Sequence, residues 1–181
     1  MNAGVPGAEV MERLSRAFGV LLDRLMLVAC LLLFVMAMLI GGDVFTRNAG
    51  LGGIEWSNEV SESILYLLTL LSAPWLLRQG QHIRVDILLR AVPPRIGWYM
   101  EWAGDLIGLA CSIYLVWYGV KVLGASYAAG AITIKTLVTP EWWLIAPLPI
   151  AFLLVAIEFV FRMHRLSRSE RAPRSDSVSV A

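Results

Sequence analysis

The segment from Arg78 to Arg95 reads RQGQHIRVDILLRAVPPR and separates two long apolar parts of the chain. It is too charged to cross a bilayer, yet its apolar residues suit a helix that lies on a membrane surface. Pro93 and Pro94 then end such a helix, because proline has no N–H and its ring blocks the preceding turn. We therefore expect an interfacial helix over about 82–92 that joins two membrane hairpins.

The spacing within this segment favours a helix over a strand. A lone strand at a bilayer surface would leave its backbone groups unpaired, although the first half alternates between polar and apolar residues. In a helix, residues four apart share a face, which gives a polar face and an apolar face. The polar face holds His82, Asp86 and Arg90, and the apolar face holds Val85, Leu88, Leu89 and Val92.

The composition is that of a membrane protein. Of the 181 residues, 58% are hydrophobic and 16% are charged, against about 45–50% and about 25% in ordinary soluble domains. The sequence contains no phosphate-binding loop, no nucleophile motif and no nucleic-acid-binding surface. Cys30 and Cys111 lie within apolar runs and suggest neither a disulfide nor a metal site. We expect no enzymatic activity, no cofactor and no nucleic-acid partner.

Four apolar segments predict an all-α integral membrane protein with four transmembrane helices. Residues 25–42 lack any charge and exceed the apolar core of a secretory signal, so they form part of the first membrane helix. We expect one membrane domain over residues 1–163 and a disordered tail over residues 164–181. The expected transmembrane helices cover about 20–42, 58–77, 97–123 and 140–161.

The distribution of basic residues predicts the orientation of the chain. Twelve of its 15 Lys and Arg residues lie in the N-terminal segment, the 78–95 segment or the tail. The positive-inside rule then places these three regions, and both termini, in the cytoplasm. The other three basic residues are Arg47, Lys121 and Lys135.

Asp105 is the clearest charge within an expected membrane helix. A carboxylate at that depth should face protein and have a partner, and Arg24 near the inner end of the first helix is our candidate. We predict a structural ion pair rather than a proton relay for this residue, because no second acid continues the path across the membrane. Glu158 precedes Arg162 by four residues, which predicts a local pair in the last helix.

Two further groups of charges have alternative interpretations. Three interpretations fit Glu59 and Glu62 at the start of the second helix: solvated acids near the helix N-terminus, residues that contact a partner protein, or ligands of an ion. The charges of the 78–95 segment either extend into water from a simple elbow or form a defined contact through Arg78, His82 and Asp86. A metal site is disfavoured because His82 and Asp86 supply only two ligands.

The sequence also resembles a known family. Arg78-Gln-Gly-Gln-His82-Ile83-Arg-Val85-Asp86, followed by Leu-Leu and a proline, is similar to the signature of DctQ-type small permease subunits of TRAP transporters (tripartite ATP-independent periplasmic). Trp56-Ser57-Asn58-Glu59 is similar to the W-S-E-E of that family, with Asn58 in place of the first acid. The resemblance covers roughly residues 20 to 162.

The resemblance implies a three-part importer in the bacterial inner membrane. A periplasmic binding protein captures an organic acid, and a large multi-span subunit carries it inward, usually with sodium. The small subunit is then a non-catalytic scaffold that holds neither substrate nor ion. The residues implied as structural or partner contacts are Arg78, His82, Ile83, Val85, Asp86, Trp56, Glu59 and Glu62.

Two other functions fit the composition. A self-sufficient four-helix transporter needs a charge at mid-membrane, for which Asp105 is the candidate. A membrane anchor of a respiratory enzyme that binds haem needs histidines within its helices, whereas His82 and His164 lie at or beyond the expected membrane edge.

Overall fold

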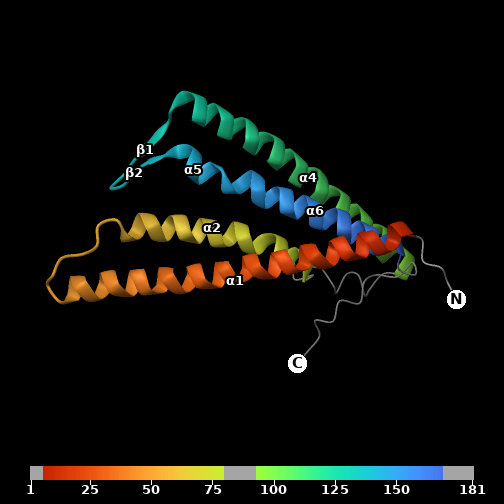
Figure 1. Cartoon of the computed structure of the whole chain (residues 1–181), viewed down its shortest axis with the longest axis horizontal. Coiled ribbons are helices and arrows are strands. Elements are labelled where there is room, and N and C mark those ends of the chain that lie inside the picture. Colours follow the sequence, from red (N-terminus) through yellow and green to blue (C-terminus); the bar gives the residue numbers. More distant parts are fainter. Residues whose placement is uncertain (1–5, 80–92, 169–181) are drawn as a thin grey trace.

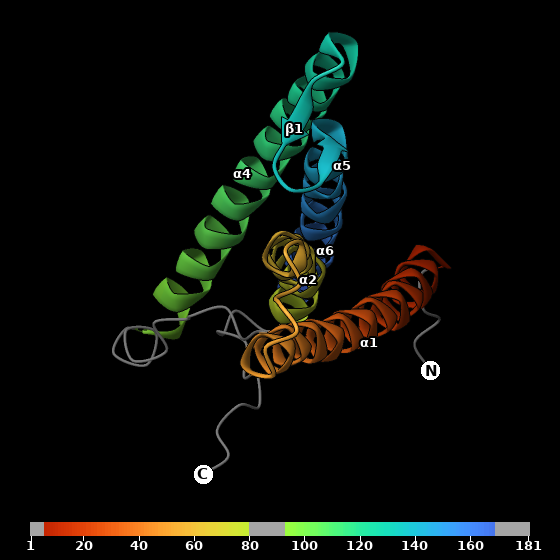
Figure 2. The same ribbon diagram turned by 90° about the vertical axis from the view of Figure 1, so that its left-hand side faces the viewer.

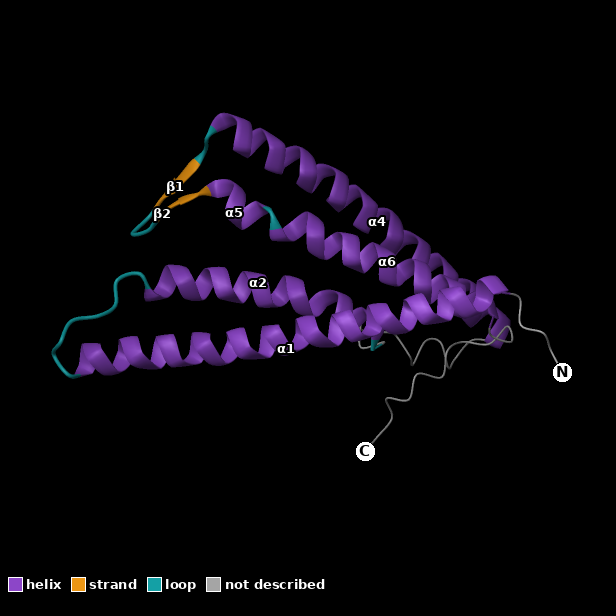
Figure 3. Cartoon of the chain, in the orientation of Figure 1, coloured by secondary structure: helices purple, strands orange, loops and turns teal. Residues whose placement is uncertain are grey.

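The computed structural model describes residues 6–79 and 93–168, and helices make up most of this part of the chain (Figures 1 and 3). Two very short strands pair antiparallel, with Thr133 opposite Thr139. In chain order the elements are α1 (Pro6–Asn48), α2 (Ser57–Arg78), α4 (Pro94–Ala129), β1 (Ile132–Ile134), β2 (Val138–Pro140), α5 (Glu141–Ile145) and α6 (Pro147–Arg168).

Four stretches of helix are long and apolar enough to cross a membrane, which confirms the predicted number. They are Val10–Asn48, Ser57–Arg78, Ile96–Ala129 and Glu141–Ser167, the last combining α5 and α6. The expected interfacial helix over about 82–92 lies outside the described residues. It therefore stays a prediction, together with the two-hairpin arrangement that it would join.

The helices pack as a chain of neighbours. α1 contacts α2, α2 contacts α6, and α6 contacts α4. In the view of Figure 1 the ribbons draw together toward the end that holds the start of α1 and the end of α6, and they spread apart toward the end that holds the 49–56 segment and the β1–β2 turn. Figure 2, turned by 90°, shows that the starts of α1 and α4 nevertheless lie on opposite sides of the molecule. We call the two ends seen in Figure 1 the termini end and the loop end.

Several helix boundaries differ from those expected. α1 has 43 residues, roughly 64 Å at 1.5 Å per residue, so it extends well beyond a hydrocarbon core of about 30 Å. Residues 164–168, expected to be disordered, form the last turn of α6 because Leu166 is fully buried and Arg165 is ion-paired. α4 continues to Ala129 and ends at Gly130, whose φ of 60° favours glycine.

Polar residues are prominent in the described interior. Fully buried apolar side chains are few, whereas large apolar side chains cover the outside, as expected where lipid replaces water. The polar or charged residues buried among the described part are Asp43, Ser57, Ser61, Asp105, Ser112, Ser126, Glu158 and Arg162. Close packing between α4 and α6 relies on a small residue, since a Cβ at Gly108 would overlap the ring of Phe159.

Candidate functional site

The centre of the termini end is Glu158 of α6, which has no exposed surface. Its Oε2 accepts a hydrogen bond from Nη1 of Arg78 at 3.0 Å, and its Oε1 accepts one from Nη2 of Arg165 at 2.5 Å. A buried carboxylate is costly unless both of its oxygens have partners. The two guanidinium groups meet this requirement. Because Arg78 belongs to α2 and Glu158 to α6, their hydrogen bond also joins these two helices.

Arg78 also reaches α1. Its Nη2 donates to the backbone carbonyl oxygen of Ser15 at 2.8 Å. The approach is possible because α1 has Gly19 at this position, where a Cβ would lie only 2.7 Å from the same nitrogen. One guanidinium therefore joins α1, α2 and α6.

A second buried pair lies beside the first. Nε of Arg162 donates to Oδ1 of Asp105 at 3.3 Å, and Nη1 of Arg162 donates to the carbonyl oxygen of Leu77 at 2.6 Å. Both charged side chains are less than 10% exposed. Arg162 thus connects α6 with both α4 and α2. We call Arg78, Asp105, Glu158, Arg162 and Arg165 together the Glu158 cluster.

Two predicted ion pairs are wrong. Asp105 pairs with Arg162 rather than Arg24, because α4 packs against α6 and Arg24 is exposed on α1. Glu158 does not pair with Arg162 four residues later. Glu158 instead binds Arg78 of α2, whereas Arg162 binds Asp105 of α4. The partners of Glu158 come from another helix and from a residue two turns further along α6.

Of the motif residues Arg78, His82, Ile83, Val85 and Asp86, only Arg78 lies in the described part of the chain. Arg78, at the last position of α2, is a member of the Glu158 cluster. His82, Ile83, Val85 and Asp86 lie outside the described residues, so their contacts stay predictions.

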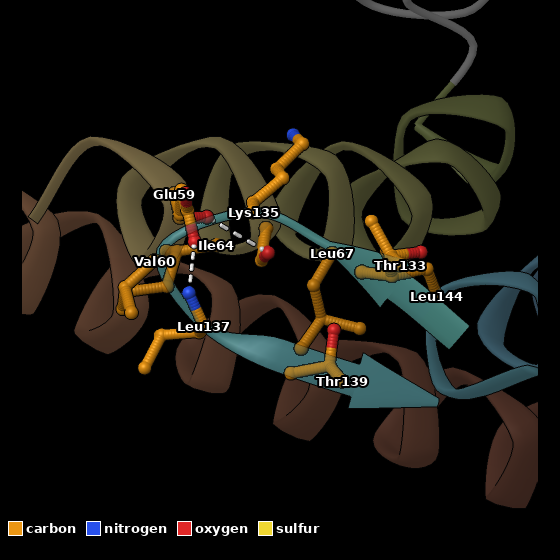
Figure 4. Close-up of a pocket in the computed structure, with 10 residues that line it drawn as sticks. Glu59, Val60, Ile64, Leu67, Thr133, Lys135, Leu137, Thr139 and Leu144 are labelled. Atoms are coloured by element: carbon orange, nitrogen blue, oxygen red, sulfur yellow. Dashed lines mark hydrogen bonds between the residues drawn. The ribbon is translucent and has the colours of Figure 1, made fainter. Parts of the chain in front are cut away.

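At the loop end, Glu59 of α2 holds the β1–β2 turn (Figure 4). Its Oε1 accepts a hydrogen bond from the backbone N–H of Thr136 at 2.6 Å, and its Oε2 accepts one from that of Leu137 at 2.9 Å. Hydrogen bonds to an ionised carboxylate are stronger than those between neutral groups. Glu59 therefore connects α2 to the turn between α4 and α5.

The neighbouring carboxylate adds an ion pair. Nζ of Lys135 donates to Oε2 of Glu62 at 2.9 Å; the Lys135 side chain is 47% exposed and that of Glu62 is 70% exposed. This hydrogen bond and the charge of Glu62 raise the pKa of Lys135 above its ordinary value. Trp56 precedes the first residue of α2 and is 43% exposed. We call Glu59, Glu62, Lys135, Thr136 and Leu137 the Glu59 contact.

Sequence reasoning missed a third polar site, in α1. Asp43 is buried. Its Oδ1 accepts a hydrogen bond from the backbone N–H of Ile54 at 2.6 Å, and its Oδ2 accepts one from Nη2 of Arg47 at 2.9 Å. Its carboxylate thereby fixes the glycine-rich segment between α1 and α2. The available signal was the four-residue spacing of Asp43 and Arg47, next to the three glycines Gly50, Gly52 and Gly53.

Neither end resembles a metal centre. Within residues 6–79 and 93–168, no three His, Cys, Asp or Glu side chains come together as metal ligands would. The charged groups of the two ends instead bind one another and the backbone.

A family model described as "Tripartite ATP-independent periplasmic transporters, DctQ component" matches residues 36–169. The chain belongs to this DctQ family. This membership confirms the resemblance drawn from the 78–86 and 56–59 motifs and identifies the chain as the small permease component of a TRAP transporter. The matched range includes the Glu158 cluster and the Glu59 contact, whereas Ser15 and Gly19 precede it. A comparison with curated proteins gave no match.

Replacing Arg162 with alanine should lower the free energy of unfolding by about 3 kcal/mol, because it removes the charge that faces buried Asp105. Equilibrium titration with SDS in mixed micelles would measure the change. Arg24→Ala is the matched control and should change the free energy by less than about 0.5 kcal/mol, since Arg24 is exposed. Equal losses in both variants would contradict the assignment of Arg162 as the partner of Asp105.

Gly19→Leu should lower the free energy of unfolding by about 2 kcal/mol, because the new side chain would displace the guanidinium of Arg78. A Cβ added at Gly41 in the same helix would meet no atom within 4 Å, so Gly41→Leu should leave the free energy of unfolding unchanged. The effect of Gly19→Leu should shrink in an Arg78→Ala background, because the displaced group is then gone. An undiminished effect there would show that the contact with Arg78 is not its cause.

Glu59→Gln should speed hydrogen exchange at the amides of Thr136 and Leu137, since a neutral amide accepts more weakly than a carboxylate. Exchange at single residues, followed by mass spectrometry with electron-transfer fragmentation, would detect this change. Glu55→Gln alters an exposed acid four residues earlier and should have no effect. Unchanged exchange in Glu59→Gln would mean that the turn is held by other contacts.

Proposed function

We propose that this DctQ-family chain is a non-catalytic scaffold for the large subunit of a TRAP importer. In this role it supports uptake of an organic acid that a periplasmic binding protein delivers, driven by symport through the large subunit. The observation that carries the proposal is the pairing in the Glu158 cluster. Its buried charges bind one another and the backbone across α1, α2, α4 and α6, as expected of groups that fix helix positions.

We place the termini end on the cytoplasmic side of the bacterial inner membrane. The excess of Arg residues in the N-terminal segment, the 78–95 segment and the tail supports this orientation. The Glu158 cluster then lies near the cytoplasmic surface. The Glu59 contact lies on the periplasmic side, where the binding protein would arrive.

The Glu158 cluster suggests a role for the central motif. Arg78 fixes the last residue of α2 to α1 and α6, and the segment from His82 to Asp86 begins only a few residues later. We propose that this segment forms an amphipathic elbow whose start is set by Arg78. The elbow would keep the two predicted hairpins in the shape that the large subunit requires.

Uptake measurements in cells that lack this chain would test the scaffold role. We expect uptake of the importer's labelled organic acid to be lost, and to be restored by the wild-type chain. Asp105→Asn should reduce the amount of assembled complex and the maximal uptake rate in parallel, with the KM for substrate unchanged. Asp86→Ala should reduce assembly more than membrane insertion, measured by co-purification and membrane fractionation.

Two results would contradict the proposal. Uptake at the normal rate by the large subunit and binding protein alone would show that no scaffold is needed. A changed KM in Asp105→Asn, at an unchanged amount of complex, would favour a direct role of this chain in transport.

A further inference from the structure

α4 carries a stripe of aromatic and polar side chains on the side that faces away from α6. The helix is the last in the row α1, α2, α6, α4, and its other side has no neighbour among the described residues (Figures 1 and 2). The stripe there recurs every three or four residues and holds Tyr114, Trp117, Tyr118 and Lys121. Tyr114 is 63% exposed, Trp117 74% and Tyr118 52%. We call these four residues the α4 stripe.

The α4 stripe lies at the depth of the bilayer centre. Aromatic residues of α4 mark the two membrane surfaces, Trp102 toward the termini end and Tyr127 toward the loop end. At 1.5 Å per residue, Tyr114 is roughly 18 Å along the helix from Trp102 and roughly 20 Å from Tyr127. Lys121 is roughly 10 Å further toward the loop end, still inside a hydrocarbon core whose half-thickness is about 15 Å.

Hydrocarbon cannot satisfy the polar atoms of the α4 stripe. Two phenol hydroxyls, an indole N–H and an ammonium group all donate hydrogen bonds, and within residues 6–79 and 93–168 none of them has an acceptor. A donor without an acceptor is costly in an apolar medium, and a charged group is costlier still. The Cα–Cβ bonds of a helix lean toward its N-terminus, which for Lys121 is the direction of the membrane centre.

The outside of α1 shows a surface of this chain that suits lipid. Within its uncharged membrane segment, Leu27, Leu31, Phe34 and Met38 are about as exposed as the α4 stripe. These four side chains carry no hydrogen-bond donor, so acyl chains can cover them without loss. The donors of the α4 stripe instead indicate a protein on that side of the molecule.

We propose that the α4 stripe binds a membrane helix of the large subunit of the importer. This proposal rests on the proposed function, which supplies the large subunit as the partner. The facing helix offers a carboxylate opposite Lys121, and hydroxyl or main-chain carbonyl oxygens opposite Tyr114 and Trp117. Such hydrogen bonds between helices are what holds membrane helices together where apolar contacts are no better than lipid. Tyr and Trp are also the residues that most often dominate the binding energy of an interface.

A second copy of this chain does not complement the α4 stripe. Two copies with the same orientation in the membrane meet around a two-fold axis along the membrane normal, which places equal residues at equal depth. Lys121 would then face Lys121, and like charges repel strongly at low dielectric constant. The indole of Trp117, which only donates, would likewise face another donor.

Photo-crosslinking in the intact importer would identify the partner. We expect p-benzoylphenylalanine at position 117, irradiated in native membranes, to join this chain to the large subunit, as detected by mass spectrometry. A crosslink between two copies of this chain would overturn the proposal in favour of a homodimer. Labelling of lipid alone would overturn it in favour of a lipid-facing surface.

Variants that remove the donors give a second test. Trp117→Leu and Lys121→Leu should each lower the amount of large subunit that co-purifies with this chain at least fivefold, because both changes leave an acceptor unpaired. The amount of this chain in the membrane should stay the same. Ile113→Ala is the matched control; Ile113 is 56% exposed at nearly the same depth but about 100° around α4 from Tyr114, so co-purification should be unchanged.

Unchanged or increased co-purification in Trp117→Leu and Lys121→Leu would contradict the proposal, since a surface that faces lipid tolerates or favours leucine. If the wild-type chain still co-purifies with the large subunit in that case, the scaffold role stands and its contact lies on another face. Failure of the wild-type chain to co-purify at all would contradict the proposed function and this proposal with it.

Discussion

The structure depends on one buried carboxylate with two guanidinium partners. Glu158 has no exposed surface, and its two oxygens are taken by Arg78 and Arg165. In lipid the cost of leaving such a charge unpaired greatly exceeds that in water, so the contact restricts how α2 and α6 can sit relative to each other. Arg162 adds α4 to the same region, and the carbonyl of Ser15 adds α1.

Polar contacts determine the relative positions of the helices because the hydrophobic effect cannot do so within a bilayer. Between helices in a bilayer, lipid tails are as apolar as leucine, so apolar side chains gain little by moving from lipid to protein. The arrangement of the helices is therefore determined by small residues, which allow close approach, and by directed hydrogen bonds. Gly108 under the ring of Phe159 illustrates the former, and the Glu59 contact illustrates the latter at the opposite end of α2. Polar contacts consequently hold α2 at both of its ends.

The parts that sequence reasoning predicted follow from local properties. Apolar runs of about 20 residues predict membrane helices regardless of how those helices pack, and all four are present. The partner of Asp105 was not predictable in this way. Arg24 and Arg162 were both expected near the inner ends of their helices, and only the packing order of the helices decides between them. The partners of Glu59 are backbone amides, which have no sequence signature at all.

The contact between Arg78 and α1 has a consequence for how related chains would be compared. Its acceptor is a main-chain carbonyl, present whatever side chain occupies position 15. The requirement that this contact places on α1 is therefore steric, a missing Cβ at Gly19 rather than a charge or hydroxyl. A search for a complementary acid on the first helix would overlook the contact, whereas a search for a single small residue facing the end of the second helix would find it.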